Sequence, residues 1–425
     1  MDLAYREDRP VFWFAVTAFI ISSGVLAYTH MGYPLLALTL AKWMGRPHRA
    51  IALASDDELP RISVLIAAYN AEASIERRLT NLFDTDFPLD RMEVIVATDG
   101  CTDQTARLAR LAGFPRVKVI EFAQRRGKTS TLVSSMPAVN HEVVVFTDAT
   151  TTFEKRTLRL LAQRFVDPEV GIVTGRVEMV DNHQRSAEGF YWRLESQLRE
   201  AEAALDALVG ASGAVYAIRR QSFVPPTTTQ LNDDLVLPML SRMRTRLKFI
   251  LEPKAVAQVI APASLKGDYQ RRVRVGTGAF QSFRELRGLL HPRQGRIAIS
   301  FFSHKVLRWL SPLFLLSAFV SNALLWQVPV FRIALLTQGV CYGVALLGLL
   351  VPGQSTVARR MRIATSFAVV NIAFAVGFVN WLRNRNKATW EPTVRPLESP
   401  QPYARTIRNP SSRSRLSGRV GRRIG

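Results

Sequence analysis

Acidic residues stand where two short apolar runs of this sequence end. Asp99, followed by Gly100, comes after the run at 94–97, and Asp148 comes after the run at 143–146. An aspartate and a glycine at a strand end can accept hydrogen bonds from a base or ribose while the chain turns sharply. A carboxylate that emerges from a buried sheet suits Mg²⁺ or Mn²⁺, which take their other ligands from substrate phosphates. Taken alone, either aspartate could equally serve an ordinary turn or a helix cap.

Two further segments carry charges suited to phosphate binding and proton transfer. Residues 125–128 form a cationic, glycine-containing loop of the kind that grips a diphosphate, and a solvated basic loop is the alternative. Asp233 and Asp234 are adjacent carboxylates, and the pKa of one carboxyl in such a pair rises towards general-base use. A helix cap made by Asn232 or Asp233 is the alternative, but it leaves Asp234 without a role. A cluster of Arg271, Arg272 and Arg274 could hold phosphate or lipid headgroups.

The elements that must position these residues lie between residues 55 and 267. Five short runs there are rich in Val and Ile, as expected for strands buried on both faces. They lie at 62–68, 94–97, 117–120, 143–146 and 171–173. Helical periodicity at 73–83 and 105–112 separates them, which predicts an α/β domain with a mainly parallel sheet. Ligands bind such sheets at the carboxyl ends of the strands, where the candidate residues stand.

Composition narrows the class of protein further. The chain has 425 residues, a net charge of +22 and only two cysteines, Cys101 and Cys341. Two cysteines exclude a disulfide scaffold and a four-thiolate zinc site. The basic residues concentrate beside apolar stretches and in the tail rather than among aromatic residues of the soluble region, so we expect membrane lipids and no nucleic acid as partners.

Four stretches without a charged residue are each long enough to cross a bilayer. They lie at 11–29, 310–331, 333–358 and 363–382. The sequence therefore predicts a multi-pass membrane protein with five regions. These are an N-terminal transmembrane helix and linker (1–54), the α/β domain (55–267), amphipathic basic interfacial helices (268–309), three transmembrane helices (310–382) and a basic disordered tail (383–425).

Arginines at 359, 360 and 362 predict, by the positive-inside rule, that the loop before the last stretch and the α/β domain are cytoplasmic. If each of the four stretches crosses the membrane once, the tail lies outside, although its eleven Lys and Arg contradict the rule. Either the tail is tolerated there, or the last stretch re-enters without crossing, or residues 11–40 hide a second pass. We expect four crossings.

The order of the motifs resembles the inverting family 2 glycosyltransferases of the GT-A fold. The resemblance is strongest to the membrane-integrated branch with the cellulose, chitin, hyaluronan and poly-N-acetylglucosamine synthases, and covers about residues 60–290. It rests on motifs in a fixed order along the chain. These are residues 68–70, Asp99 with Gly100, Gly127 with Lys128, Asp148, Gly210 with Ser212 and Gly213, Asp233 with Asp234, and the arginine cluster.

The resemblance implies a nucleotide-sugar donor, with UDP as the expected nucleotide, and a lipid-linked or saccharide acceptor. Asp234 matches the family's general base and Asp233 the preceding acid, while Asp148 matches the carboxylate that holds Mg²⁺ or Mn²⁺. The remaining matches concern donor and acceptor binding. Base or ribose contacts are implied for Asp99, Gly100, Tyr69 and Asn70, diphosphate contacts for Lys128, Arg271, Arg272 and Arg274, and an acceptor loop for Gly210, Ser212 and Gly213. A cytoplasmic catalytic domain at a bacterial inner membrane is also implied.

Three residues depart from the family pattern. Thr150 stands where the metal motif commonly has a second aspartate, so metal binding would rest on Asp148 and the phosphates. Arg271 and Val275 replace the glutamine and tryptophan of the arginine motif, and the missing tryptophan leaves processive polymerisation open. A membrane-anchored nucleotide-sugar-binding module without catalytic activity is the alternative to an enzyme.

Overall fold

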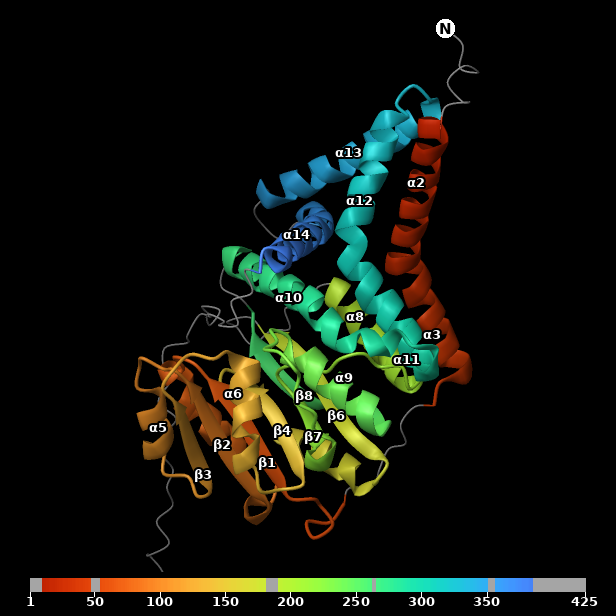
Figure 1. Cartoon of the computed structure of the whole chain (residues 1–425). Helices are drawn as coiled ribbons and strands as arrows, with labels where there is room; N and C mark the ends of the chain where they lie inside the picture. The colour runs from red at the N-terminus through yellow and green to blue at the C-terminus, as the bar shows by residue number, and fades with distance from the viewer. Residues whose placement is uncertain (1–9, 47–53, 181–189, 262–264, 351–355, 385–425) are drawn as a thin grey trace, which may run out of the picture.

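A computed structural model describes residues 10–46, 54–180, 190–261, 265–350 and 356–384 (Figure 1). Of the predicted tail at 383–425, residues 385–425 lie outside these described residues. One α/β domain forms the lower part of Figure 1, and long helices rise from one end of it.

The α/β domain is built on one sheet of eight strands, in the order β3-β2-β1-β4-β7-β6-β8-β5. The strands are β1 (Ile62–Ala68), β2 (Met92–Asp99), β3 (Val117–Phe122), β4 (Val143–Asp148), β5 (Thr152–Phe153), β6 (Val170–Val180), β7 (Tyr216–Arg219) and β8 (Lys248–Ile260). Strands β3, β2, β1 and β4 are parallel neighbours, as are β6 and β8. Strands β7 and β5 run antiparallel to their neighbours, so the sheet is mixed.

The five runs predicted as strands coincide with β1, β2, β3, β4 and β6. The domain's helices are α4 (Glu72–Phe83), α5 (Thr105–Leu111), α6 (Lys128–Ser135), α7 (Thr157–Gln163), α8 (Phe190–Ala204) and α9 (Asp233–Thr245). The predicted α/β class is therefore confirmed, with three strands that the sequence reading did not include.

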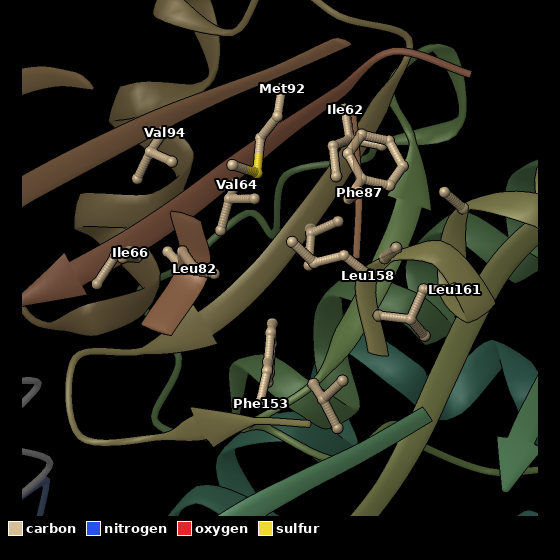
Figure 2. Close-up of a cluster of buried hydrophobic side chains, with 14 of the residues drawn as sticks. Ile62, Val64, Ile66, Leu82, Phe87, Met92, Val94, Phe153, Leu158 and Leu161 are labelled. Carbon is tan, nitrogen blue, oxygen red and sulfur yellow. The ribbon is translucent and has the colours of Figure 1, made fainter. Parts of the chain in front are cut away.

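Both faces of the central strands are buried. Every residue of β1 is buried, with Val64 and Ile66 in one apolar cluster and Leu65 in the other. Figure 2 shows the first cluster, in which the strand residues pack against Leu82 of α4 and Leu158 of α7. Burial of each such side chain stabilises the fold by about 1.5–3 kcal/mol. This rigid centre fixes the strand ends where the polar residues stand.

Four helices of the described chain are long and apolar enough to cross a membrane: Pro10–Met44, Arg296–Leu324, Pro329–Leu349 and Arg360–Leu382. The first is continuous through α2 (Pro10–Ala27), the π-helical turn η1 (Tyr28–Gly32) and α3 (Tyr33–Met44). Pro34 has no N–H to donate, but the π-helical turn directly before it changes the hydrogen-bond pattern there, and the helix continues through this residue.

The remaining helices continue from α10 (Leu265–Leu286). They are α11 (Arg296–Ser300), the π-helix η8 (Phe301–Val306), α12 (Leu307–Leu324), α13 (Pro329–Leu350) and α14 (Thr356–Leu382). Helix α12 is joined to the first helix by the hydroxyl pair of Ser22 and Ser317 at 2.9 Å and by His30 Nε2 with Ser311 Oγ at 3.1 Å. Helix α14 crosses α10 closely, because a Cβ on Gly377 would stand 2.6 Å from the backbone N of Thr277.

The first helix and α12 run side by side away from the sheet (Figure 1). In Figure 1 the start of α2 and the turn between α12 and α13 lie together at the end far from the sheet. The end of α3 and the start of α11 lie beside the domain. Helices α8 and α10 therefore lie between the sheet and the helices that could cross a membrane (Figure 1).

Candidate active site

Three charged side chains meet at the carboxyl end of the sheet. Lys128 begins α6, Asp148 ends β4 and Asp233 begins α9. The Lys128 ammonium lies 2.8 Å from Asp148 Oδ1 and 3.1 Å from Asp233 Oδ1. The Tyr216 hydroxyl on β7 donates to the other oxygen of Asp233 at 3.1 Å. One cation therefore holds two carboxylates from separate elements in fixed positions.

The pKa values in this group follow from burial and from the partners. Burial alone would lower the pKa of Lys128, but the carboxylates of Asp148 and Asp233 outweigh it and raise that pKa above its ordinary value. Burial raises the pKa of Asp233 to about 6, and the charges of Asp234 and Asp148 add to the rise, while Lys128 opposes it. Lys128 thus stays charged, and Asp233 titrates closer to neutrality than an ordinary aspartate.

Asp234 follows Asp233 at the start of α9 and, unlike Asp233, has no ion pair within the part of the chain that the structure describes. No hydrogen bond or ion pair with another described residue engages its carboxylate, and the side chain lines the cavity described below. A Cβ on Gly213 would stand 3.1 Å from Asp234 Oδ2, so only glycine leaves the carboxylate its present place. An open carboxylate at this position can accept a proton from a bound hydroxyl.

The loop with Gly210, Ser212 and Gly213 is fixed against this acid. The backbone N–H of Ala211 donates to the Asp234 carbonyl oxygen at 2.7 Å. The Ser212 N–H donates to Thr174 Oγ1 at 2.9 Å. The Arg199 guanidinium of α8 lies 3.3 Å from the Gly210 carbonyl oxygen and 3.4 Å from Ser212 Oγ. The predicted acceptor loop therefore lies beside the predicted base.

Tyr69 and Asn70 stand at the end of β1. The Arg125 guanidinium lies 3.8 Å from the centre of the Tyr69 ring, in cation–π geometry. Asn70 holds the neighbouring strand end, because its Oδ1 accepts from the Thr102 N–H at 2.9 Å and its Nδ2 donates to Thr102 Oγ1 at 3.1 Å. Both residues line the cavity.

Asp99 is completely buried and does not line the cavity. Its two oxygens accept from the N–H groups of Arg126 and Gly127, at 2.6 and 2.8 Å. Gly100 has φ +64°, and a Cβ there would stand 2.6 Å from the Arg125 nitrogen. Asp99 and Gly100 therefore hold the basic loop in place, and a contact between Asp99 and a base or ribose would require one of these hydrogen bonds to be given up.

The arginine cluster divides along α10. Arg271 and Arg274 line the cavity, whereas Arg272 does not. Asp268 pairs with Arg272 Nε at 2.6 Å and with Arg271 Nη2 at 3.2 Å. Burial, followed by the neighbouring charge of Arg271, lowers the pKa of Arg274. Two arginines that face one cavity favour an anion there.

A cavity of about 710 Å³ joins these residues. Of the residues predicted from sequence, Asp99, Gly100, Gly210 and Arg272 lie outside its lining. The other ten line it: Tyr69, Asn70, Lys128, Asp148, Ser212, Gly213, Asp233, Asp234, Arg271 and Arg274. Most residues of the predicted site therefore lie around one cavity, and the roles assigned to them stay predictions.

The side chains around Asp148 that could ligate a divalent metal are few. The described residues contain no group of three His, Cys, Asp or Glu side chains that could hold a metal ion. Asp148 keeps about a third of its side chain exposed, at 36%, and Thr150 also lines the cavity. One carboxylate and a hydroxyl fit Mg²⁺ or Mn²⁺ only when phosphate oxygens complete the shell. The residues fit a metal that arrives with a diphosphate.

The sequence reading missed several polar residues of the cavity. They include Arg77 of α4, Arg176 of β6, Glu195 and Arg199 of α8, and Lys305 of η8. A charged residue near an apolar span is a functional signal, and Lys305 stands shortly before the stretch at 310–331. Arg199 lies in a helix without any marking motif, so no sequence signal would have found it.

Comparison with known proteins defines the class that this fold and site represent. Residues 60–274 match the family described as "Glycosyltransferase like family 2". The chain belongs to the family 2 glycosyltransferases. The predicted family and its enzyme class are confirmed.

The curated relatives match about half of the chain. It is 25% identical over 236 residues to a poly-beta-1,6-N-acetyl-D-glucosamine synthase of Staphylococcus aureus. The aligned region covers 53% of this chain and 56% of the relative. It is also 30% identical over 130 residues to a probable glycosyltransferase, YdaM, of Bacillus subtilis. That alignment covers 29% of this chain and 31% of YdaM. The chain therefore spans about half the length of the curated relatives it matches.

Among solved structures, the fold is similar to a mannosyltransferase from Pyrobaculum calidifontis in complex with GDP-Man and Mn²⁺. The TM-score is 0.65 at 22% identity, over 87% of this chain and 99% of that one. The predicted GT-A fold is thus confirmed, and the similarity extends beyond the α/β domain.

Proposed function

We propose that the protein is an inverting glycosyltransferase that moves a sugar from a nucleotide diphosphate sugar, with UDP as the expected nucleotide, to a lipid-linked or saccharide acceptor at the membrane. The observation that carries the proposal is the open Asp234 carboxylate beside the group of Lys128, Asp148 and Asp233 in one cavity. A base next to a cationic phosphate site is what this displacement needs.

In the proposed reaction, an acceptor hydroxyl oxygen attacks the anomeric carbon of the donor. The bond from that carbon to the phosphate oxygen breaks, and the nucleoside diphosphate leaves with the electron pair. Asp234 takes the hydroxyl proton. Attack opposite the leaving group inverts the anomeric centre. Lys128, Arg271 and Arg274 are the cations that stabilise the negative charge of the leaving diphosphate.

Asp148, together with the donor phosphates, would hold Mg²⁺ or Mn²⁺, which supplies further charge neutralisation when bound. Asp233 has a supporting role, because its carboxylate holds the Lys128 ammonium at 3.1 Å. Tyr69 and Asn70 would face the nucleoside. Asp99 is proposed to act through the basic loop whose N–H groups it binds.

We further propose that the α/β domain lies in the cytoplasm, where nucleotide sugars are made, with the four apolar helices in the cell membrane. Helices that adjoin the cavity would keep a membrane-borne acceptor near Asp234. The N-acetylglucosamine polymer named for the S. aureus relative makes an N-acetylhexosamine donor one candidate to test.

A screen of nucleotide sugars tests the proposal. The full chain is purified in detergent, and release of nucleoside diphosphate is measured with each donor, with Mn²⁺ and with membrane lipid extract as the acceptor source. We expect release with at least one UDP-sugar and its loss in Asp234→Asn. No release with any donor, or full release by Asp234→Asn, would contradict the proposal.

A further inference from the structure

The catalytic cavity extends beyond the sheet to the helices that could cross a membrane. At that end it is lined by Glu195, Arg199 and Glu200 of α8 and by Lys305 of η8. Lys305 belongs to the candidate span Arg296–Leu324. A ligand at this end of the cavity can therefore contact both the α/β domain and a membrane helix.

Lys305 is a partly buried cation without a partner. Its ammonium makes no hydrogen bond or ion pair with another residue of the described chain. The charged groups nearest to it are Glu195, Arg199, Glu202 and Arg308. A charge in a membrane span is costly, and it is retained where it binds something.

The neighbouring acids pair with residues other than Lys305. Glu195 accepts from Arg308 Nη1 at 2.7 Å and pairs with His304 Nε2 at 2.9 Å. Glu202 pairs with His304 Nδ1 at 2.7 Å and accepts from the Tyr33 hydroxyl at 2.8 Å. His304 and Arg308 hold the pKa of Glu195 well below its usual range, although burial opposes this. Glu195 therefore remains ionised. The second oxygen of Glu202, Oε2, has no hydrogen-bond partner among the described residues, yet Lys305 pairs with neither acid.

Lys305 faces the cavity from a π-helical segment. Residues 301–306 form a π-helix within an otherwise α-helical segment. In a regular helix, successive side chains point about 100° apart. Here His304 meets the two acids while the next residue faces the cavity. Such π-turns are frequent at functional sites.

We propose that Lys305, with Arg199, binds the phosphate that links a lipid tail to the acceptor, at the membrane end of the catalytic cavity. The proposal rests on the proposed function and specifies its acceptor class as an anionic phospholipid-type carrier rather than a neutral saccharide. A phosphate is the ligand that an unpaired ammonium beside a guanidinium favours. Because Lys305 lies on η8, within a helix that could cross the membrane, the lipid tail of a ligand bound there can remain in the bilayer.

Equilibrium binding to the full chain in nanodiscs of zwitterionic lipid tests the proposal. The probes are farnesyl phosphate, farnesol and inorganic phosphate, and the variants are Lys305→Met, Lys305→Arg and Lys42→Met. Lys42 is exposed at the end of α3 and does not line the cavity, so its variant is the matched control. Methionine keeps the length of the lysine stem and removes the charge.

We expect farnesyl phosphate to bind the wild type, and its affinity to fall about thirty-fold or more in Lys305→Met. Lys305→Arg and Lys42→Met should bind it like the wild type, and farnesol should bind weakly to all four proteins. Because Lys305→Met removes an unpaired charge, its melting temperature should be equal or higher. Equal binding of farnesyl phosphate by Lys305→Met and wild type would overturn the proposal, as would inorganic phosphate binding with equal affinity.

Binding of UDP with Mn²⁺ separates this proposal from the proposed function. Lys305→Met should bind UDP like the wild type, since Lys128, Arg271 and Arg274 face the donor. A loss of UDP binding without a loss of farnesyl phosphate binding would assign Lys305 to the donor and overturn the proposal. Failure of the wild type to bind UDP would instead contradict the proposed function, whatever the lipid result.

Discussion

Lys128 Nζ lies 2.8 Å from Asp148 Oδ1, so the proposed phosphate-binding cation already neutralises the proposed metal carboxylate. The pair is formed between the start of α6 and the end of β4. An incoming diphosphate with its metal would compete for both partners at once. The site is thus stable without ligand and is arranged to exchange its internal ion pair for contacts with the donor.

Asp234→Asn and Asp148→Ala should both abolish transfer, but in different ways. Removal of the base lowers kcat by about 10²–10⁴-fold, because Asn cannot accept the proton. UDP binding should survive, since Asp234 contacts no phosphate in the proposed mechanism. Removal of Asp148 should weaken UDP binding in the presence of Mn²⁺. Calorimetric titration of UDP, beside a turnover assay, separates the two effects.

The matched control for both variants is Asp90→Asn, which alters an exposed acid outside the cavity lining. It should keep the activity and the UDP affinity of the wild type. An active Asp234→Asn enzyme would remove the base assignment, and unchanged UDP affinity in Asp148→Ala would remove the metal assignment.

Metal binding should depend on the nucleotide. Because Asp148 is the one carboxylate assigned to the metal, we expect weak Mn²⁺ binding to the protein alone and a rise of at least about ten-fold in affinity when UDP is present. Electron paramagnetic resonance of free Mn²⁺ measures this directly. Turnover should stop in excess chelator and return with Mg²⁺ or Mn²⁺. Undiminished turnover in excess chelator would contradict the metal role.

The parallel half of the fold could be predicted from sequence because buried parallel strands are continuous Val and Ile runs, as in β1 and β4. The sequence reading did not include β5, which has two residues, or β7, which has four. Both are too short for a periodic pattern to distinguish them. Their antiparallel pairing follows from tertiary contacts that no local pattern records.

Site residues were predictable where a motif ends a strand, as at Asp148. The pairing of Lys128 with Asp148 and Asp233 was not, since it depends on how three separate elements pack. Burial of Asp99 under the basic loop was missed for the same reason. A sequence shows which groups stand at strand ends but not which of them are already bonded to the protein.

Gly213→Ala should lower activity while the protein remains folded. The added Cβ would stand 3.1 Å from Asp234 Oδ2, so the carboxylate must shift by a few tenths of an ångström. Misplaced general bases lose activity steeply, and we expect kcat to fall about ten-fold or more. Gly339→Ala is the control, because a Cβ on this α13 glycine meets nothing within 4 Å. Equal kcat values for the two variants would show that Asp234 has no fixed position in catalysis.

Glu93→Gln should destabilise the protein in a pH-dependent way. Burial alone would raise the pKa of Glu93, but hydrogen bonds from Ser63, Asn140 and Lys118 lower it to about 2. A carboxyl whose folded pKa lies below its unfolded value stabilises the protein above about pH 4.5, and this stabilisation is lost as the pH falls towards 2. Glutamine cannot accept these bonds as an anion, so we expect a loss of about 1–3 kcal/mol at neutral pH.

The measurement is thermal unfolding of the full chain in detergent, followed by intrinsic fluorescence between pH 3 and 7. The gap in melting temperature between wild type and Glu93→Gln should be constant near neutrality and should shrink below about pH 4.5. Glu121→Gln, an exposed acid on β3, should change the melting temperature little. A gap that does not depend on pH would show that the charge of Glu93 does not stabilise the fold.

The orientation of the four helices makes a prediction that does not depend on the chemistry. The start of α2 and the turn between α12 and α13 lie at the same end of the molecule, and the α/β domain lies at the other (Figure 1). Reporter fusions at Ser55 should therefore give a cytoplasmic signal, and those at Gln327 an external one. A fusion at Gly425 is expected to be external if Arg360–Leu382 crosses the membrane. An external signal at Ser55 would exclude a cytoplasmic active site, whereas an internal signal at Gly425 would only remove the fourth crossing.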